Sequence, residues 1–401
     1  MKTLKEADEL GLKNKKALLR VDFNVPIKNG EILDDTKIKD SIPTISWLRD
    51  KNAKVILCSH IASSDKSKIL SLNPVVDRLS QLIGTQVKFS SACIGKEAEK
   101  NILSMQSRDI LLLENLRSDP YEEKNSDFFA KKMASMADIY INDAFSVSHR
   151  KHASVVGIPK YLPSYAGLSL QETLQEFNRN IKNPARPVMA IVGGKKVSTK
   201  LGLLQSLVKK VNTLYVGGAM ANTFLLSNGI SIGLSVYEPN LLDAARKITK
   251  TAHQNNCKLV FPHDVVLDNG QQVSVFNIEA NNTIMDVGKG SVEEILNHAR
   301  QSKTVWWNGP LGKFEVLPFD VGTKSLAKGL ADIGKSSSIT TIIGGGDTVY
   351  ALKKSDADFK DYTYISTAGG AFLEFIENLT LPGIEALESD LQFASTVPAW
   401  I

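Results

Sequence analysis

The stretch PVMAIVGGKKVSTKLGLLQSLVKKVNTLYVGGAM, residues 187–220, decides the fold. It begins with an apolar run of strand length that ends in Gly-Gly. It continues through a segment from Ser198 to Val211, where Leu and Val recur at three- and four-residue spacings, and it ends with a second apolar run and a second Gly-Gly pair. The continuous runs are typical of strands buried on both faces, and the spaced segment is typical of an amphipathic helix. Together they predict a parallel α/β unit with a crossover helix.

The same alternation extends along the whole chain. Helical spacing also marks Asn73 to Ile83, and an amphipathic segment at residues 163–180 separates the two halves. We therefore predict two doubly wound, parallel-sheet α/β domains that resemble the Rossmann fold. The runs of strand length lie at residues 17–26, 53–60, 109–117, 138–145, 187–194, 213–220, 258–264, 304–310, 339–348 and 363–371.

Composition limits the class of protein. A chain of 401 residues exceeds what one hydrophobic core usually organises, and 43% hydrophobic with 23% charged residues is average for globular proteins. A net charge of +5 favours small anionic ligands over nucleic acid. Cys58, Cys93 and Cys257 are widely separated and favour a reducing cytoplasm over a disulfide framework or a metal site. We also expect no signal peptide and no membrane span.

Glycine residues gather at strand ends in the second half only. Open α/β sheets bind ligands at the carboxyl ends of their strands, so this edge is where we expect chemistry. GGGDT (344–348) precedes a helical segment, an arrangement that brings backbone amides to a phosphate. Asp347 is suited to hold Mg²⁺, and Thr348 to cap the helix or donate to a phosphate. The alternative is that this run is simply a tight turn.

GGKKVSTK (193–200) places Lys196 and Lys200 four residues apart, so we expect both on one side of a nascent helix, where paired cations suit a phosphoryl group. The alternative is a solvated basic helix start. Neither a Walker A sequence nor a GxGxxG fingerprint occurs in a strand-to-helix turn. In NGPLGKFE (308–315), Glu315 is suited to ribose hydroxyls and Asn308 to a phosphate or base, although a Pro-Gly turn explains that composition equally well.

The first half places polar residues at its strand ends instead. Asp22 and Asn24 lie two apart in RVDFNVP, on one face of a strand end or in an Asx turn. Arg117 and Arg150 each follow an apolar run and offer the guanidinium fork that phosphates and carboxylates favour, and His60 joins them. Each of these three residues alone is also compatible with a surface or core role.

Nine ordered signatures together resemble the phosphoglycerate kinase family, over a span from about Leu18 to Leu387. They are RVDFNVP, SH, ENLR, NDAF with HR, VGG with KVSTKL, VGGAMANTFL, WNGP with FE, GGGDT, and STAGGAFLE. The resemblance implies reversible phosphoryl transfer between 1,3-bisphosphoglycerate and ADP, with Mg²⁺, in a cytoplasmic monomer. It implies an N-terminal 3-phosphoglycerate domain (1–166), an interdomain helix (167–180), a C-terminal nucleotide domain (181–380) across a cleft, and a segment (381–401) that returns to the first domain.

Site residues follow from the same resemblance. It assigns catalysis to Lys37, Lys196, Gly345 and Gly369, with Asp347 at the metal. Substrate binding falls to Asp22, Asn24, Lys37, His60, Ser63, Arg117 and Arg150. Nucleotide binding falls to Gly194, Lys200, Gly218, Asn308, Pro310, Glu315, Gly344, Gly345, Gly346, Asp347 and Thr348.

The chain departs from the family pattern at several positions. Lys37 and Ser63 stand where the family usually has arginines, so we expect a functional kinase with weakened glycerate affinity or turnover. Lys66 or Lys68 is a possible substitute for the cation missing at Ser63. Two further departures, Lys195 and Lys313, add positive charge beside the nucleotide motifs, and the alternative is that both are simply solvated.

Two alternatives follow from the missing arginines. One is a catalytically impaired homologue that binds nucleotide and acts as a regulatory protein. The other is a kinase for a related small carboxylic acid. Neither nucleic acid nor a membrane is an expected partner.

Overall fold

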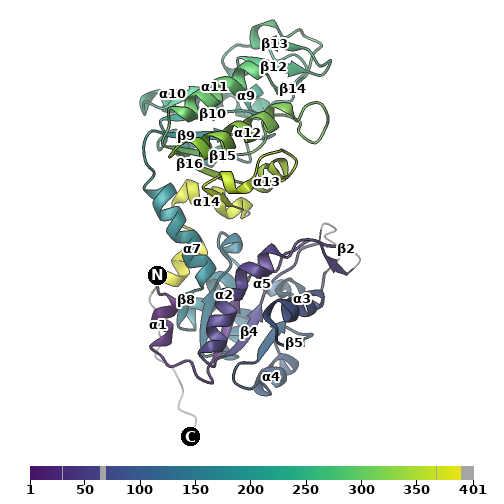
Figure 1. Cartoon of the computed structure of the whole chain (residues 1–401), viewed down its shortest axis with the longest axis vertical. Helices are drawn as coiled ribbons and strands as arrows, with labels where there is room; N and C mark the ends of the chain where they lie inside the picture. The colour runs from purple at the N-terminus through teal and green to yellow at the C-terminus, as the bar shows by residue number, and fades with distance from the viewer. Residues whose placement is uncertain (29, 64–68, 367, 390–401) are drawn as a thin grey trace. The chain divides into compact units, whose positions relative to one another are not determined.

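The computed structural model describes the chain except residues 29, 64–68, 367 and 390–401, so Lys66, Lys68 and most of the C-terminal extension lie outside the described residues. The chain divides into two compact units. Unit 1 comprises Met1–Glu176 with the segment that begins at Thr380, and unit 2 comprises Phe177–Leu379. Figure 1 labels their elements along the chain. No described helix is long and apolar enough to cross a membrane.

Unit 1 has a six-stranded parallel sheet in the order β5-β6-β4-β1-β7-β8. Its elements are α1 (Leu4–Asp8), β1 (Lys16–Arg20), β2 (Ile27–Lys28), β3 (Glu31–Ile32), α2 (Thr36–Asp50), β4 (Lys54–Cys58), α3 (Asn73–Ile83), β5 (Val87–Ser90), α4 (Lys96–Leu103), β6 (Ile110–Leu113), η1 (Leu116–Ser118), α5 (Pro120–Glu123), α6 (Asp127–Ser135), β7 (Ile139–Asn142), η2 (Phe145–Val147), η3 (Ala153–Gly157), η4 (Ile158–Lys160), β8 (Ser164–Ala166), α7 (Leu168–Phe177), where the unit boundary falls, and α15 (Pro382–Glu388).

Unit 2 has a second six-stranded parallel sheet, β11-β10-β9-β15-β16-β17, and a three-stranded antiparallel sheet, β13-β12-β14. Its elements are η5 (Asn178–Lys182), β9 (Val188–Val192), α8 (Leu201–Leu207), β10 (Thr213–Val216), α9 (Met220–Ser227), η6 (Pro239–Leu241), α10 (Leu242–Gln254), β11 (Lys258–Val260), β12 (Asp264–Leu267), β13 (Gln272–Ser274), η7 (Val275–Asn277), β14 (Ile284–Val287), α11 (Lys289–Arg300), β15 (Thr304–Asn308), α12 (Val321–Ser336), β16 (Thr340–Gly344), α13 (Gly346–Lys353), η8 (Phe359–Asp361), β17 (Tyr364–Ser366) and α14 (Gly369–Asn378).

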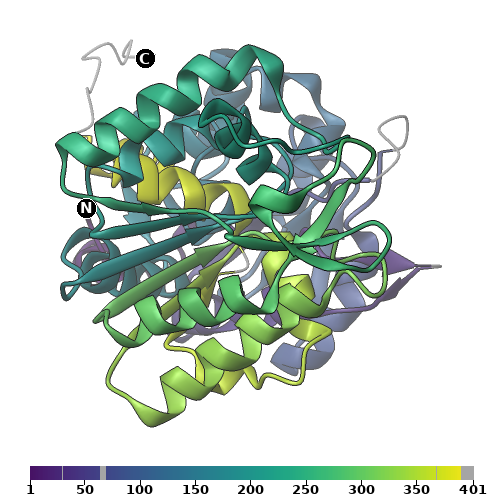
Figure 2. The ribbon, with the colours of Figure 1, turned by 90° about the horizontal axis from the view of Figure 1, so that it is seen from above.

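The sheet of unit 2 is buried on both faces, as its uninterrupted apolar strands predict. Ile191 and Trp307 belong to a core cluster with residues of α11 and α12. Successive side chains of a strand point to opposite faces, so the neighbouring residues pack on the other side, where α8 and α14 lie against each other. Figure 2 shows helices above and below this sheet.

The strand order of unit 2 locates its ligand edge. Counted along the chain, the six strands run 3-2-1-4-5-6, so the order reverses between β9 and β15. Open α/β sheets bind ligands at that switch point, outside the carboxyl ends of the strands. The Gly-Gly pair after β9 and the NGP sequence at the end of β15 therefore meet where a ligand is expected.

The predicted doubly wound architecture is confirmed, and each of the ten apolar runs contains a strand. The helix expected at Asn73 to Ile83 has those same bounds. The expectation of a helix from Ser198 to Val211 is too long, because α8 spans only Leu201–Leu207. Strands β2, β3, β5, β8, β13 and β14 lie outside the predicted runs, and β12 shares only Asp264 with the run at 258–264.

Candidate active site

Two loops of unit 2 touch backbone to backbone at the switch point. A Cβ atom on Gly193 would lie 2.1 Å from the Pro310 carbonyl oxygen, and one on Gly309 would lie 2.3 Å from the Gly193 oxygen. Gly309 also has a φ of +95°. Glycine at these positions is therefore required for the loops after β9 and β15 to approach each other.

A half-buried lysine links the same loops. The Lys200 ammonium donates to the Gly193 carbonyl and to Asn308 Oδ1, both at 2.6 Å. The Asn308 amide in turn donates to the Gly344 carbonyl at 2.6 Å. Burial lowers the pKa of Lys200 to about 8, and the charge of Asp347 opposes that shift. The cation is therefore held at the junction of β9, β15 and β16.

The GGGDT sequence forms the predicted turn into a helix. Gly345 has a φ of +101°, and α13 begins at the next residue. Thr348 is buried and its hydroxyl accepts a hydrogen bond from the Gly309 N–H at 2.7 Å, so it fastens the turn to the loop after β15. Asp347 stays exposed in the first turn of α13. Gly369 likewise begins a helix, α14, at the end of β17.

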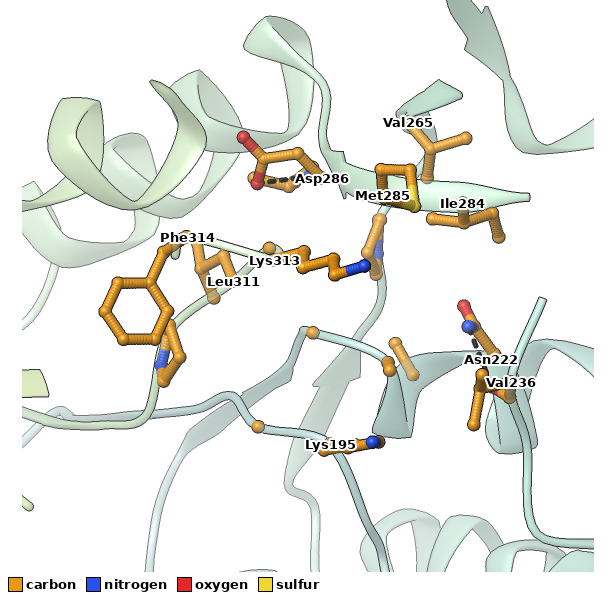
Figure 3. A pocket seen from close by; sticks show the side chains of 18 of the residues that line it. Lys195, Asn222, Val236, Val265, Ile284, Met285, Asp286, Leu311, Lys313 and Phe314 are labelled. Carbon is orange, nitrogen blue, oxygen red and sulfur yellow. Dashed lines mark hydrogen bonds between the residues drawn. The ribbon is translucent and has the colours of Figure 1, made fainter. Parts of the chain in front are cut away.

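A cavity of about 430 Å³ lies beside these loops (Figure 3). Of the residues predicted to bind nucleotide, five line it: Gly194, Gly218, Pro310, Glu315 and Asp347. The opposite walls are apolar and include Val236 before η6, Val265 on β12 and Ile284 on β14. One end of the cavity thus offers glycine amides and a carboxylate, and the rest offers an apolar surface suited to a flat base.

Lys196 and Lys200 do not share a helix face, so that expectation is wrong. Both residues precede α8, which begins at Leu201, and the chain before it forms turns rather than a helix. Lys200 turns inward to Asn308, whereas Lys196 is exposed. Their spacing carried no information because the helical period applies only within a helix.

In unit 1, Asp22 connects three elements. The Asn24 N–H donates to Asp22 Oδ1 at 3.0 Å, which is the Asx turn considered from the sequence. Lys37, in the first turn of α2, lies 2.7 Å from Asp22 Oδ2, and the Ser146 hydroxyl donates to the same oxygen. Burial alone would raise the pKa of Asp22, but Lys37 and its other neighbours outweigh it and lower that pKa. Asn24 accepts from the Ala62 N–H at 3.0 Å, beside Ser63.

His60 lies against a buried arginine that the sequence analysis did not single out. Arg20, at the end of β1, is 1% exposed, and its guanidinium lies 3.2 Å from His60 Nδ1. Burial and then the charge of Arg20 lower the pKa of His60 well below its ordinary value. Arg20 also donates to the Ser154 hydroxyl, which in turn donates to the buried carboxylate of Glu122. Glu122 thereby balances the buried guanidinium.

Arg117 and Arg150 add to a positive field at this edge. Arg117 lies in η1, which follows β6, and forms an ion pair with Glu123 at 3.0 Å. Arg150 is exposed. Burial and then Arg150 lower the pKa of His149 to about 4. Burial and then Arg117 lower the pKa of His152 to about 4. This edge of the unit 1 sheet therefore carries a positive potential, which an anionic ligand would neutralise.

Sequence patterns indicated some of this site and missed the rest. The glycine turns and charged strand ends were predicted from residue type. The apolar cavity wall was missed because Val236, Val265 and Ile284 carry no motif, and Arg20 was missed although a charge within the apolar run ALLRV is a usable signal.

Parallel sheets whose strand ends carry glycine loops and cations are suited to phosphoryl transfer, the chemistry of the phosphotransferase class. A model described as phosphoglycerate kinase matches residues 7–378 of the chain. The phosphoglycerate kinase of Caulobacter vibrioides is 45% identical over 96% of this chain and 100% of its own length, and that of Orientia tsutsugamushi is 43% identical over 98% and 99%. The chain belongs to the phosphoglycerate kinase family.

Solved structures agree with this assignment. Phosphoglycerate kinase from Coxiella burnetii matches with a TM-score of 0.84 at 36% identity, covering 95% of this chain and 98% of that one. The enzyme from Pyrococcus horikoshii matches with a TM-score of 0.80 at 26% identity, covering 97% and 98%.

Proposed function

We propose that the chain transfers a phosphoryl group reversibly between 1,3-bisphosphoglycerate and ADP, giving 3-phosphoglycerate and ATP in glycolysis and gluconeogenesis. The observation that carries this proposal is the cavity of unit 2, where glycine loops, Asp347 and an apolar wall meet beside the switch point. Unit 2 would bind the nucleotide. Unit 1, with Arg20, Arg117 and Arg150 near one another, would bind the acid.

The reaction explains why this site needs cations and amides rather than a general base. The carboxylate of 3-phosphoglycerate is already ionised near neutral pH, so the protein must position it and stabilise charge on the transferring phosphoryl group. Lys196 would meet that charge, together with amides near Gly345 and Gly369. His60 would contact the acid as the neutral imidazole, since its pKa is lowered.

Asp347 fits a role in holding Mg²⁺. Its carboxylate is exposed in the first turn of α13 and lines the cavity. Mg²⁺ is usually held by one or two carboxylates with substrate phosphates, so one acidic side chain suffices. Bound Mg²⁺ would neutralise charge on the nucleotide phosphates.

We further propose a cytoplasmic monomer. All three cysteines are buried and unpaired, which suits a reducing compartment. Gel filtration coupled to light scattering would test the monomer, for which a mass near 43.9 kDa is expected.

A coupled assay with 3-phosphoglycerate and MgATP tests the function. We expect turnover well above the enzyme-free background. No turnover together with intact ADP binding would instead identify an impaired homologue with a regulatory role. Higher kcat/KM for another small phosphorylated acid would identify a different substrate, since Ser63 stands where the family usually has an arginine.

A further inference from the structure

The cavity of unit 2 contains a lysine that the nucleotide motifs do not explain. Lys313 belongs to the loop after β15, and its backbone N–H donates to the Met285 carbonyl at 2.8 Å. That bond holds the loop against β14. Figure 3 shows the Lys313 side chain extended across the cavity, with its nitrogen on the side of Met285 and Ile284 and away from Phe314.

Lys313 is exposed, so water reaches its ammonium, while most of the cavity side chains near it are apolar (Figure 3). Val236, Val265, Ile284 and Met285 line that part of the cavity. Within the part of the chain that the structure describes, the Lys313 ammonium has no hydrogen bond or ion pair. An ammonium group carries three donors and accepts nothing, so only water or a ligand acceptor can satisfy it here. A ligand that offers such an acceptor gains a charge-assisted hydrogen bond.

The two additional lysines of the cavity occupy different places in it. Lys195 directly follows Gly194 in the glycine loop, where phosphates are expected, whereas Lys313 extends along the apolar walls, where a base is expected. The position of Lys313 therefore bears on the identity of the base rather than on the number of phosphates.

Purine bases differ in what they offer to a cation. Adenine carries an amino donor at position 6, whereas a 6-oxopurine carries a carbonyl acceptor there, beside the N7 acceptor, and lysine binds that pair well. We propose that Lys313 determines nucleotide specificity, by extending the range of this site to 6-oxopurine nucleoside diphosphates. This inference rests on the proposed nucleotide site of unit 2. A hydrogen bond to a charged group makes a difference of about ten- to a hundredfold in affinity.

Calorimetric titration of the whole chain with Mg-ADP and Mg-IDP tests the proposal, because in IDP a carbonyl replaces the 6-amino group and no 2-amino group is added. Three variants are compared with the parent: Lys313→Met, which keeps the stem and removes the charge, Lys313→Gln, and the control Lys195→Met. We expect both Lys313 variants to raise the ratio of the IDP Kd to the ADP Kd by about tenfold. Lys195→Met should leave that ratio unchanged.

A change in this ratio of less than threefold in both Lys313 variants would overturn the inference, as would an equal change in Lys195→Met. Circular dichroism confirms that each variant is folded. Failure of the coupled assay with 3-phosphoglycerate would refute the proposed reaction and leave the ratio of dissociation constants to decide this inference. If the parent bound neither nucleotide, the inference and the nucleotide site would fall together.

Discussion

Lys196 is an exposed cation before α8, and among the described residues its ammonium has no hydrogen bond or ion pair, although its charge acts on Glu238. Such a group is available to the transferring phosphoryl group rather than to the fold. We expect Lys196→Ala to lower kcat by about a hundredfold to a thousandfold, the size found for removal of one transition-state donor. Affinity for ADP should stay nearly unchanged.

Steady-state kinetics with a parallel ADP titration measure both effects. Lys209→Ala, which removes an exposed lysine beyond α8, is the matched control and should behave like the parent. Parental kcat in Lys196→Ala would show that this lysine has no catalytic role.

Lys200 is a half-buried cation, and its environment predicts that ADP binding depends on pH. Because burial lowers its pKa to about 8, the ammonium is present below pH 8 and lost above it. Phosphate binding needs the charge, so ADP affinity should fall above pH 8, by up to about tenfold for each pH unit. Lys200→Arg keeps its charge over this range and should flatten the profile. Identical profiles for parent and variant between pH 7 and 9.5 would rule out this role.

Lys37 shows what is lost with the usual arginine. Its ammonium pairs with Asp22 at 2.7 Å. Lysine lacks the planar guanidinium of arginine, which can bind a carboxylate or phosphate through two parallel hydrogen bonds. We expect Lys37→Arg to lower the KM for 3-phosphoglycerate by roughly threefold to tenfold and to raise activity, since a bidentate contact adds about 1 kcal/mol. The control is Lys39→Arg, on the same helix and paired with Asp35 at 2.8 Å, which should change neither quantity. The same KM for 3-phosphoglycerate and the same activity in both variants would contradict a role for position 37 in substrate binding.

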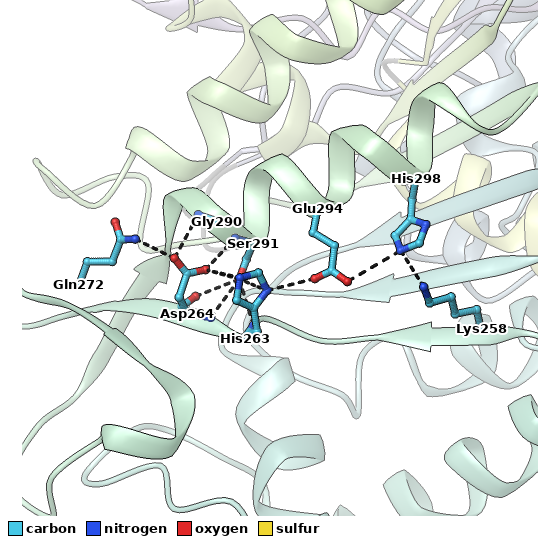
Figure 4. A network of polar contacts seen from close by, with 8 residues as sticks. All are labelled: Lys258, His263, Asp264, Gln272, Gly290, Ser291, Glu294 and His298. Carbon is cyan, nitrogen blue, oxygen red and sulfur yellow. Dashed lines mark hydrogen bonds and ion pairs between the residues drawn. The ribbon is translucent and has the colours of Figure 1, made fainter.

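At the scale of elements, one carboxylate fastens β12 to α11. Asp264 accepts hydrogen bonds from the backbone N–H groups of Gly290 at 3.0 Å and Ser291 at 2.7 Å, and so caps the start of the helix. Figure 4 shows this group within a network that continues through Glu294 to His298. Because Val265 follows Asp264 on the same strand and lines the cavity, the cap also supports the cavity wall.

Asp264→Ala should lower the free energy of unfolding by about 1 to 3 kcal/mol, because it removes the cap and leaves buried donors unpaired. Urea titration followed by circular dichroism measures this loss. The matched control is Asp243→Ala, which changes a 95% exposed acid in the first turn of α10 and should cost less than about 0.5 kcal/mol. An equal loss of unfolding free energy in both variants would show that Asp264 stabilises the protein no more than an exposed acid at a helix start.

At the scale of the whole molecule, the chain leaves unit 1, forms unit 2 and returns. The returning α15 is part of unit 1: its Gly383 N–H donates to the Ser148 carbonyl at 2.7 Å, and Leu381, Ile384 and Leu387 are buried. Ser148 lies two residues before Arg150. The last described element therefore supports the loop that carries Arg150, which we propose contacts the substrate.

Each unit has a core of its own, which makes a separable stability prediction. Leu381 in unit 1 and Leu352 in unit 2 are both fully buried, and truncating either to alanine should cost about 2 to 5 kcal/mol. Leu381→Ala should weaken unit 1 only, and Leu352→Ala unit 2 only. Hydrogen exchange read by mass spectrometry assigns the lost protection to each unit. Equal loss across both units in either variant would mean that they unfold as one cooperative body.

The extent of sequence-based prediction follows from how local each feature is. The Asx turn at Asp22 and the helix turn at Gly345 depend on a few consecutive residues, so residue type alone indicated them. Strands β12 and β14 went unrecognised because their partly exposed residues form no continuous apolar run. Lys196 and Lys200 do not share a helix face because α8 begins only at Leu201, after both lysines.

The amino-acid sequence by itself determined the doubly wound class, the ten apolar strands and the family, because hydrophobic periodicity and motifs depend on residues that are close in the sequence. Only the tertiary structure decided which side chains are enclosed. Lys200 meets Asn308 across 108 positions of sequence, and Arg20 meets His60 across 40. Burial and the field of distant charges set the ionisation of Lys200 and His60, and neither quantity exists until the strands have assembled into a sheet.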